Sequence, residues 1–418
     1  MSVAGTPKWI NFPRVAMEAV SMLAAAAALL APGINWTLPN EPPIDPALLM
    51  TTEELCREEG FQCETHSTET QDGYQVTAHR ILPAAAARGA VLVMSGLIGC
   101  SDNFVLSGRN KSLAYMLADA GYDVVLGNQR GCAYSRRHRK WTRRDPQYWR
   151  YTLDDVGRYD MPALLSLTQR LTGNPRVFFV GVSAGGNAFY TWLELVPRMR
   201  SVVRAAFLMA PGVLFTQRHS QLLKAIALFP DKAISDFGKN ADEMLGRPPG
   251  FVRLAWQMCR PDSPVRSTCE SLVEIMTGLN PSRSDFSRLE FFVAHSLCGT
   301  STTALAQYAQ NIKTGKFQAY DWGREENLRR YGREAPPEYR LQNVSTPIAV
   351  FVGKSDRFVS YQDALTLSRV TSKNIGMFLM PPEEFDHFDF IGNKEAHRYA
   401  YGKIIALMNE HEDSEEQQ

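Results

Sequence analysis

The sequence predicts an α/β protein with a mostly parallel central sheet, helices on both faces of the sheet, and a helical cap insertion. Two patterns lead to this prediction. Short apolar runs typical of buried strands alternate with segments of helical periodicity, from about residue 90 onward and again from about residue 348. Between them, residues 215–331 carry apolar positions at helical spacing without strong strand runs. We therefore expect a core of residues 34–214 and 332–409, interrupted by a cap or lid at 215–331.

The length and composition are sufficient for a large globular core, and they exclude few classes of function. The chain has 418 residues, 44% of them hydrophobic, and a net charge of +1, which gives no overall reason to expect nucleic acid as a partner. Basic residues are nevertheless dense between Arg130 and Arg150. A phosphate-binding patch is one interpretation; we favour a solvated loop paired with acids such as Asp145, Asp154 and Asp155.

The N-terminus resembles an export signal. Lys8 and Arg14 precede the apolar run Ala19–Gly33, which is short for a bilayer span but suits a signal-peptide core. We expect residues 1–33 to be a signal peptide, with a signal-anchor as the alternative. N-glycosylation triplets begin at Asn35, Asn110 and Asn343. The predicted location is therefore secreted or lysosomal, or membrane-tethered if the segment is retained.

Seven cysteines cannot all pair within one chain. Cys56 with Cys63, and Cys259 with Cys269, are close enough in sequence for local disulfides in an oxidising compartment. The other three, Cys100, Cys132 and Cys298, leave at least one free thiol. Since no Cys or His cluster has the spacing of a metal site, we predict no structural zinc.

Taken in order, the chain begins with turns, a helix and a hairpin. A proline-rich link at 40–46 precedes a short helix at Leu49–Gly60, and Thr70–Leu82 forms a hairpin with its turn at Gln71–Gly73.

The alternating α/β segment follows. Asn110 is expected to cap a helix over Lys111–Ala120, and Pro162 is expected to kink the helical stretch Leu153–Leu171 or mark its true start. The tail at 410–418 is acidic and is expected to be disordered. The remaining elements are strands at Ala90–Met94, Tyr122–Leu126, Val177–Val180 (ending at Gly181), Val203–Met209, Ile348–Val352 and Gly376–Met380, and helices near Gln362–Val370 and Lys394–Met408.

The stretch Gly181-Val182-Ser183-Ala184-Gly185 joins a strand to a helix. It matches G-x-S-x-G, the turn that raises a nucleophilic serine above the sheet edge. Glycines are needed there because side chains would collide in so tight a turn. An ordinary strand-to-helix loop is the alternative for this pattern. We predict that Ser183 is a nucleophile.

A serine nucleophile needs a base and a group that orients the base. Asp356 follows the strand Ile348–Val352, and His387 lies in the loop directly after the last core strand, so acid and base come in the order expected for such an enzyme. His295 is the next candidate base but precedes Asp356. Asp386 and Asp389 compete with Asp356 as orienter, although their position beside His387 disfavours them.

Two backbone N–H groups are expected to bind the oxyanion. One belongs to Ala184, directly after the nucleophile, and the other to Leu97, in the turn Ser95-Gly96-Leu97 after an early strand. The alternative for the second is a plain strand-ending turn. Because both donors are backbone groups, their side chains can vary without removing them.

Several longer motifs are spread over about residues 50–408. They are Asp72–Tyr74, Gly96–Leu106, Asn110–Ala114, Ala118–Val124, Leu126–Asn128, Tyr134–His138, Tyr159–Ala163, Gly299–Ser301, Gly315–Asp321 and His387–Phe390. Together these stretches resemble the acid lipase family of gastric, lysosomal and insect lipases and steryl ester hydrolases. The resemblance implies a capped α/β-hydrolase fold that acts on acylglycerols or sterol esters, with Ser183, Asp356 and His387 as the triad. It also implies that the Tyr134–His138 loop is structural.

The sequence departs from the family pattern beside the predicted nucleophile and in the predicted oxyanion turn. The family has histidine where this chain has Ser95 and Val182, and glutamine where it has Ala184. Polar support of the oxyanion loop is therefore expected to be weaker. Cys100, Cys132 and Cys298 also replace other residues, which leaves a family-like disulfide pairing open.

Three functions fit these residues. The leading one is a serine-dependent lipase that needs no cofactor and meets its lipid ester substrate at a lipid–water interface, with no nucleic acid and no stable protein partner. A catalytically weak or inactive lipase-like protein that binds lipid is the alternative. Acyl transfer to an acceptor other than water uses the same residues as the first.

Overall fold

The computed structural model describes residues 43–247, 250–279, 281–342 and 344–416. The expected signal segment 1–33 and the triplets at Asn35 and Asn343 lie outside these ranges. Among the described residues, no helix combines the length and the apolar character needed to cross a membrane.

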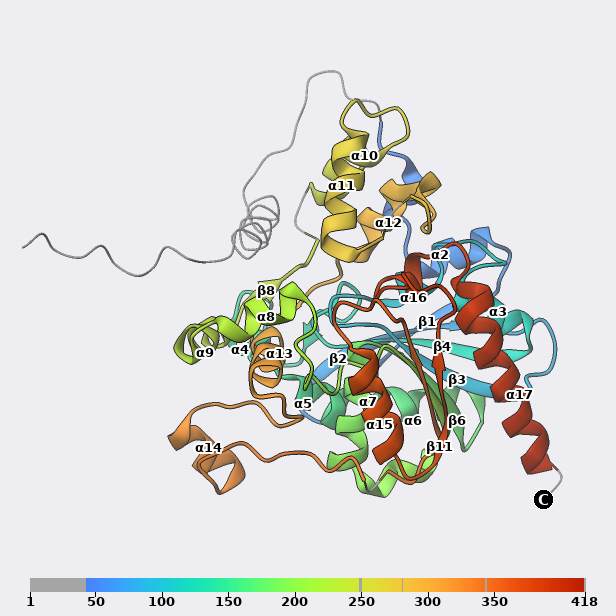
Figure 1. The fold of residues 1–418 in the computed structure, drawn as a ribbon. Coiled ribbons are helices and arrows are strands. Elements are labelled where there is room, and N and C mark those ends of the chain that lie inside the picture. Colours follow the sequence, from blue (N-terminus) through green and yellow to red (C-terminus); the bar gives the residue numbers. More distant parts are fainter. Residues whose placement is uncertain (1–42, 248–249, 280, 343, 417–418) are drawn as a thin grey trace, which may run out of the picture.

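A nine-stranded, mostly parallel sheet forms the centre of the molecule (Figure 1). Its strand order is β1-β2-β4-β3-β6-β7-β10-β11, with the short β5 paired to β2. Pairs involving β1, β2 and β5 are antiparallel, and the pairs from β4 through β11 are parallel. A small second sheet pairs β8 with β9. The strands are β1 Cys63–Glu69, β2 Tyr74–Ile81, β3 Gly89–Met94, β4 Tyr122–Asn128, β5 Arg137–His138, β6 Val177–Val182, β7 Val203–Met209, β8 Glu243–Met244, β9 Thr300–Ser301, β10 Ile348–Val352 and β11 Asn374–Leu379.

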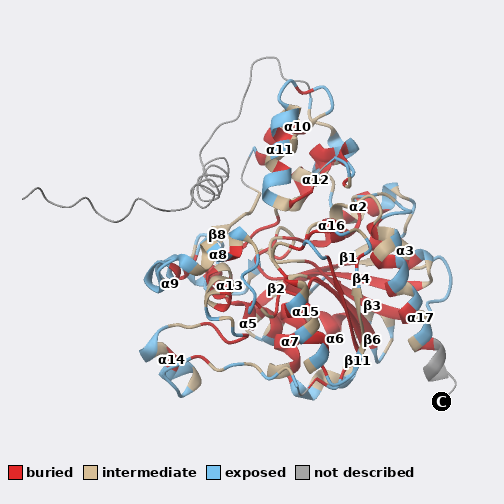
Figure 2. Ribbon diagram, viewed as in Figure 1, coloured by how far each residue is buried: buried red, intermediate tan, exposed pale blue. Residues whose placement is uncertain are grey.

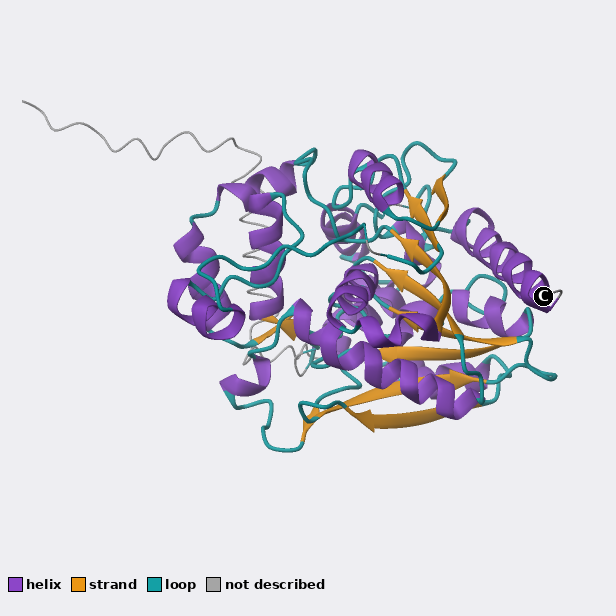
Figure 3. Cartoon of the chain, turned by 90° about the horizontal axis from the view of Figure 1, so that it is seen from below, coloured by secondary structure: helices purple, strands orange, loops and turns teal. Residues whose placement is uncertain are grey.

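Helices cover both faces of this sheet (Figure 3). Every residue of β3, β4, β6 and β10 is buried (Figure 2), as expected for parallel strands packed on two sides. The helices and helical turns are η1 Pro46–Leu49, α2 Thr52–Glu58, η2 Ser101–Phe104, α3 Leu113–Asp119, α4 Pro146–Trp149, α5 Leu153–Asp155, η3 Val156–Asp160, α6 Met161–Thr172, α7 Ala184–Leu195, η4 Pro197–Val202, α8 Gln221–Leu228, α9 Asp231–Lys239, α10 Phe251–Cys259, α11 Arg266–Thr277, η5 Phe286–Arg288, α12 Leu289–Ser296, α13 Thr302–Thr314, α14 Arg324–Tyr331, α15 Tyr361–Val370, α16 Asp389–Gly392, η6 His397–Tyr401 and α17 Gly402–Glu416.

The start of α3 differs from the prediction. Asn110 does not cap it; Ser112 occupies the position before Leu113 instead. The reason is a preceding turn, in which the N–H groups of Lys111 and Ser112 both donate to the carbonyl of Gly108 at 3.1 and 2.9 Å. The chain is therefore still turning where the helix was expected to begin.

Pro162 lies in the first turn of α6, directly after the π-helical turn η3. The backbone stays helical at Asp160 and Met161, and Met161 N–H donates to Val156 O, so the chain passes from α5 through η3 into α6 without leaving the helical conformation. Pro162 therefore follows a change from π-helical to α-helical hydrogen bonding within the stretch rather than the start of a separate helix.

The inserted segment folds into two groups of helices. One group contains α8, α9 and α13, and the other contains α10, α11 and α12 at one end of the molecule (Figure 1). Leu223 packs with Phe215 and Ile312, with Ile226 against them, and Phe251 is buried. Leu223 and Ile226 therefore form part of the apolar interior of the insertion. The boundaries 215–331 remain an expectation.

The chain end is helical rather than disordered. The prediction for 410–418 is wrong through Glu416, where α17 ends. Glu412 explains the extension, because this residue is only 7% exposed and its carboxylate forms an ion pair with Arg204 of β7. This ion pair holds the acidic helix against the core.

The disulfides agree with the prediction in one case and correct it in another. Cys259 is bonded to Cys269 as expected, but the second bond joins Cys100 to Cys298, which are 198 positions apart. Three cysteines are free and buried: Cys56, Cys63 and Cys132. Burial raises the pKa of the Cys132 thiol to about 11.

The predicted Cys56–Cys63 bond is therefore wrong. Both residues belong to the main apolar core, where their thiols interact as hydrogen-bonding neighbours, which raises the pKa of Cys63. Short separation along the chain brought the two residues together without a covalent bond between them.

Candidate active site

Ser183 occupies a sharp turn between β6 and α7. Its backbone has φ 53° and ψ −109°, a conformation that non-glycine residues seldom adopt and that costs about 1–3 kcal/mol. The turn is held by hydrogen bonds, since Ser183 N donates to Met209 O at 2.9 Å and Ser183 O accepts from Gly212 N at 3.1 Å. A Cβ at Gly185 would lie 2.6 Å from the carbonyl oxygen of Met94. Glycine is thus required for the sheet edge to approach this turn.

His387 and Asp356 converge on this serine from loops that follow the last two core strands. His387 Nε2 lies 2.9 Å from Ser183 Oγ, and His387 Nδ1 lies 2.9 Å from Asp356 Oδ2. Asp356 is 1% exposed and His387 is 7% exposed. The Oδ1 atom of Asp356 also accepts from the N–H groups of Phe358 and Val359, both at 2.8 Å. These bonds fix the carboxylate in a direction that holds the imidazole toward the serine.

The competing acids have other partners. Arg357 donates to Asp386 through its backbone N–H at 3.0 Å and its Nε at 2.6 Å. Asp389 accepts from the N–H of Asp386 at 2.7 Å. Asp386 does bind His387, but at its backbone N–H rather than its ring. Both acids therefore stabilise the histidine loop, and Asp356 is the carboxylate on the ring.

The two expected oxyanion donors flank the serine. Ala184 is the first residue of α7, and no hydrogen bond within the described ranges uses its N–H or that of Leu97. A Cβ built on Gly96 would lie 3.4 Å from Ser183 Cβ, so the turn that carries Leu97 passes beside the nucleophile. Both N–H groups are thus available close to Ser183.

His295, the alternative base, lies in a separate buried cluster. It is fully buried, and its Nδ1 lies 2.8 Å from Asp102 Oδ2. Arg247 donates to the same carboxylate at 2.6 Å, while Thr52 and Tyr134 donate to its other oxygen. Burial alone would raise the pKa of Asp102, but the hydrogen bond from His295 and the charge of Arg247 lower it far below its usual range. This cluster links the core to the inserted helices.

No local sequence pattern indicates this cluster, because its members lie far apart along the chain, between Thr52 and His295. A second buried histidine, His79, lies beside it, with Nδ1 2.8 Å from Ser101 Oγ and 3.3 Å from Asn128 Nδ2. Burial lowers the pKa of His79 to about 4. His79 is therefore neutral at neutral pH and has a structural place in the core.

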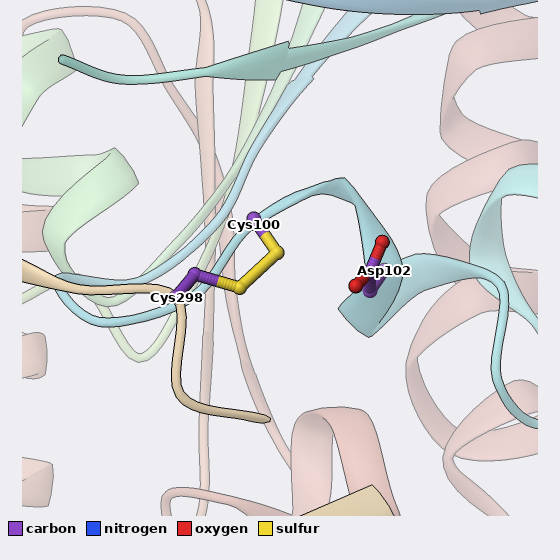
Figure 4. Close-up of side chains that lie close together, drawn as sticks. All are labelled: Cys100, Asp102 and Cys298. Atoms are coloured by element: carbon purple, nitrogen blue, oxygen red, sulfur yellow. A yellow bond between two sulfur atoms is a disulfide. The ribbon is translucent and has the colours of Figure 1, made fainter. Parts of the chain in front are cut away.

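Cys100, Asp102 and Cys298 have potential ligand atoms within 4.8 Å of one another (Figure 4). The two sulfur atoms are bonded to each other, so neither is a thiolate that could bind a metal. The carboxylate of Asp102 already has its own hydrogen-bond donors. These three residues do not fit a metal site.

Several arginines of the basic segment after β4 are paired with acids. Arg130 is buried between Asp72 and Asp160, with contacts of 2.6 and 2.7 Å, and Arg136 contacts Glu243 at 2.5 Å. Burial raises the pKa of Asp160 to about 6, against the opposing charge of Arg130. These ion pairs favour a structural segment over a phosphate-binding patch.

The pairing acids differ from those that were expected. Asp145 and Asp155 each accept hydrogen bonds from the threonine three residues earlier. Asp154 accepts from Gln307 of α13 at 2.8 Å, which ties the core to the insertion. The acids nearest in sequence serve as caps and links, while more distant acids neutralise the arginines.

A strand–serine–helix turn at the carboxyl edge of a mostly parallel sheet, followed along the chain by an acid and a histidine that meet at the serine, defines an α/β hydrolase. Comparisons with known proteins agree. The model of the alpha/beta hydrolase fold matches residues 89–393, and that of a partial alpha/beta-hydrolase lipase region matches residues 52–108. This chain belongs to the acid lipase family of α/β hydrolases. It is therefore a carboxylic ester hydrolase.

Two relatives illustrate the match. The chain is 30% identical over 378 residues to gastric triacylglycerol lipase of Bos taurus, covering 88% of this chain and 93% of the relative. It is 29% identical over 394 residues to human lysosomal acid lipase/cholesteryl ester hydrolase, covering 91% and 97%. A soluble variant of monoglyceride lipase from Saccharomyces cerevisiae shares the fold, with a TM-score of 0.50 and 14% identity over 83% of this chain and 94% of that one.

Proposed function

We propose that this protein hydrolyses lipid esters, acylglycerols or sterol esters, through an acyl-enzyme on Ser183. The observation that carries the proposal is the continuous contact from Ser183 Oγ through His387 to Asp356, with both steps at 2.9 Å. Such a contact lets a neutral hydroxyl become a nucleophile at the moment of attack.

In the first half-reaction, Ser183 Oγ attacks the ester carbonyl carbon and its proton passes to His387 Nε2. The carbonyl oxygen becomes an oxyanion that accepts from the N–H groups of Leu97 and Ala184. The bond to the alcohol oxygen then breaks, and His387 returns the proton to that oxygen. The alcohol leaves, and the acyl group stays on Ser183.

In the second half-reaction, water attacks the acyl carbon while His387 takes its proton. The Ser183–acyl bond breaks, the fatty acid leaves, and the proton returns to Ser183. Asp356 stabilises the imidazolium in both halves. All of these groups belong to the protein, so the proposed chemistry requires no cofactor.

The substrate class rests on the family. The two relatives above are named for triacylglycerol and cholesteryl ester, which share a long acyl chain on an ester carbonyl. Such substrates gather at a lipid–water interface, where the enzyme would meet them. The same relationship supports a secreted or lysosomal location. In the triplet that begins at Asn110, the asparagine itself is exposed, which is compatible with glycosylation on that route.

The test compares the wild-type protein with Ser183→Ala on a short p-nitrophenyl ester, triolein and cholesteryl oleate. We expect hydrolysis by the wild type only, with a fluorophosphonate probe labelling Ser183. Equal inertness of both proteins, together with no labelling, would show a lipase-like lipid-binding protein instead. Labelling with turnover of the short ester alone would restrict the substrate to small esters.

A further inference from the structure

The peptide between Gly96 and Leu97 has to keep a fixed orientation if the Leu97 N–H is to bind an oxyanion. A peptide unit is planar, and in the trans form its N–H and C=O point in opposite directions. No cis peptide bond occurs among the described residues. Whatever holds the carbonyl of Gly96 therefore also directs the N–H of Leu97.

Three successive carbonyls of this loop are held by donors. Gly96 O accepts from Gly99 N at 3.1 Å, Leu97 O accepts from Gln129 Nε2 at 2.7 Å, and Ile98 O accepts from Cys298 N at 2.8 Å. Gln129 Nε2 also lies 3.5 Å from Gly96 O. Gln129 thus supplies the side-chain donor to the two peptides nearest the nucleophile.

We propose that Gln129 is a positioning residue for ester hydrolysis, which orients the Leu97 N–H toward the oxyanion. This inference rests on the function proposed above. Gln129 directly follows β4, the neighbour of β3 in the sheet, so its amide reaches across to the loop that follows β3. It is 6% exposed, and little water competes for its hydrogen bond.

The residues on the other side of the loop do not supply the hydrogen bond that Gln129 donates to Leu97 O. Ser95, which stands where the family has histidine, contacts Gly96 O from its Oγ at 3.5 Å, the same distance as Gln129 Nε2. The shorter bond to Leu97 O, at 2.7 Å, comes from Gln129. Val182 and Ala184 have no polar side-chain atom. The weaker support expected from the sequence is therefore offset by an amide from the neighbouring strand.

Removing the amide donor frees Leu97 O and leaves Gly96 O held on the backbone by Gly99 N alone. Both peptides that flank Leu97 then lose a restraint, so the Gly96–Leu97 peptide and its N–H can rotate more freely. Loss of a direct oxyanion donor lowers kcat by about 10²–10³-fold. Loss of the Gln129 amide acts on that donor only indirectly, so kcat should fall less, by about 10- to 100-fold. KM should stay within about twofold of the wild-type value, because the oxyanion forms only in the transition state.

The decisive variant is Gln129→Glu, which keeps the size of the side chain but replaces its NH₂ with an acceptor oxygen. Gln129→Ala is the second variant. The matched control is Gln169→Ala, which removes another amide-to-carbonyl hydrogen bond, from Gln169 Nε2 to Pro175 O at 2.6 Å, at the end of α6. Fluorophosphonate titration gives the concentration of active sites in each preparation.

We expect both Gln129 variants to lose kcat per titrated site on p-nitrophenyl butyrate, and to bind a trifluoromethyl ketone more weakly by a similar factor. Gln169→Ala should keep the wild-type kcat. The inference is overturned if the Gln129 variants lose thermal stability or active fraction but keep wild-type kcat per site. If the wild type itself is inert and unlabelled, the proposed function fails and this inference fails with it.

Discussion

The two disulfides offer a direct test of how loop size sets stability. Replacing Cys100 and Cys298 with alanine opens a loop of 198 residues, while replacing Cys259 and Cys269 opens one of 10 residues. Chain entropy in the unfolded state predicts losses of about 5 and about 3 kcal/mol. With an unfolding entropy of about 0.9 kcal/mol/K for a chain of this length, the transition should fall by about 6 °C and about 3 °C.

The assay is thermal unfolding of the wild type and both double variants without reductant, followed by circular dichroism and calorimetry. Alanine is used because all four cysteines are buried. A thiol titration in denaturant should give three free thiols in each protein. A larger loss for the Cys259/Cys269 variant than for the Cys100/Cys298 variant would refute the loop-size argument.

Three further predictions concern the site and the core. Asp356→Asn should lower kcat by about 10⁴-fold because the wrong imidazole tautomer is favoured, measured per folded molecule; a wild-type rate would exclude Asp356 as the orienter. Gly185→Ala should abolish activity and destabilise the protein, because the new Cβ would lie 2.6 Å from Met94 O. Its control is Gly402→Ala in α17, where the new Cβ meets no atom closer than 3.5 Å. That variant should raise the free energy of unfolding by about 1 kcal/mol. The pKa of His79 is lowered to about 4, so its contribution to stability is full above pH 6.5 and is lost, by up to about 3 kcal/mol, as the pH falls toward 4. His79→Gln should therefore lose less stability than the wild type between pH 7 and pH 4.5 in thermal melts, and an equal loss in both would contradict this.

The sequence was most informative where one physical requirement dominates. The strands Val203–Met209 and Ile348–Val352 were predicted to the residue, since strands buried on both faces are nearly continuous apolar runs, interrupted here only by Arg204. Ser183, Asp356 and His387 were selected by their positions after strands, and the structure brings those three residues together.

The sequence was least informative where distant residues meet. Cys100 pairs with Cys298 because the loop after β3 lies against the end of α12, and no local pattern encodes that contact. The cluster around Asp102 was hidden for the same reason. Gln129 carried a weaker signal, since a polar residue directly after β4 lies beside the loop that follows β3 in the sheet order.

The Cys100–Cys298 bond also makes the molecule covalently circular over that span. The span contains Ser183 and the helices of the insertion from α8 through α12. A protease that nicks the chain once between these two cysteines would therefore leave the fragments joined, as a single band on a non-reducing gel and two bands after reduction. The exposed turns of the insertion that precede Cys298 can be cut without releasing the nucleophile from the rest of its site.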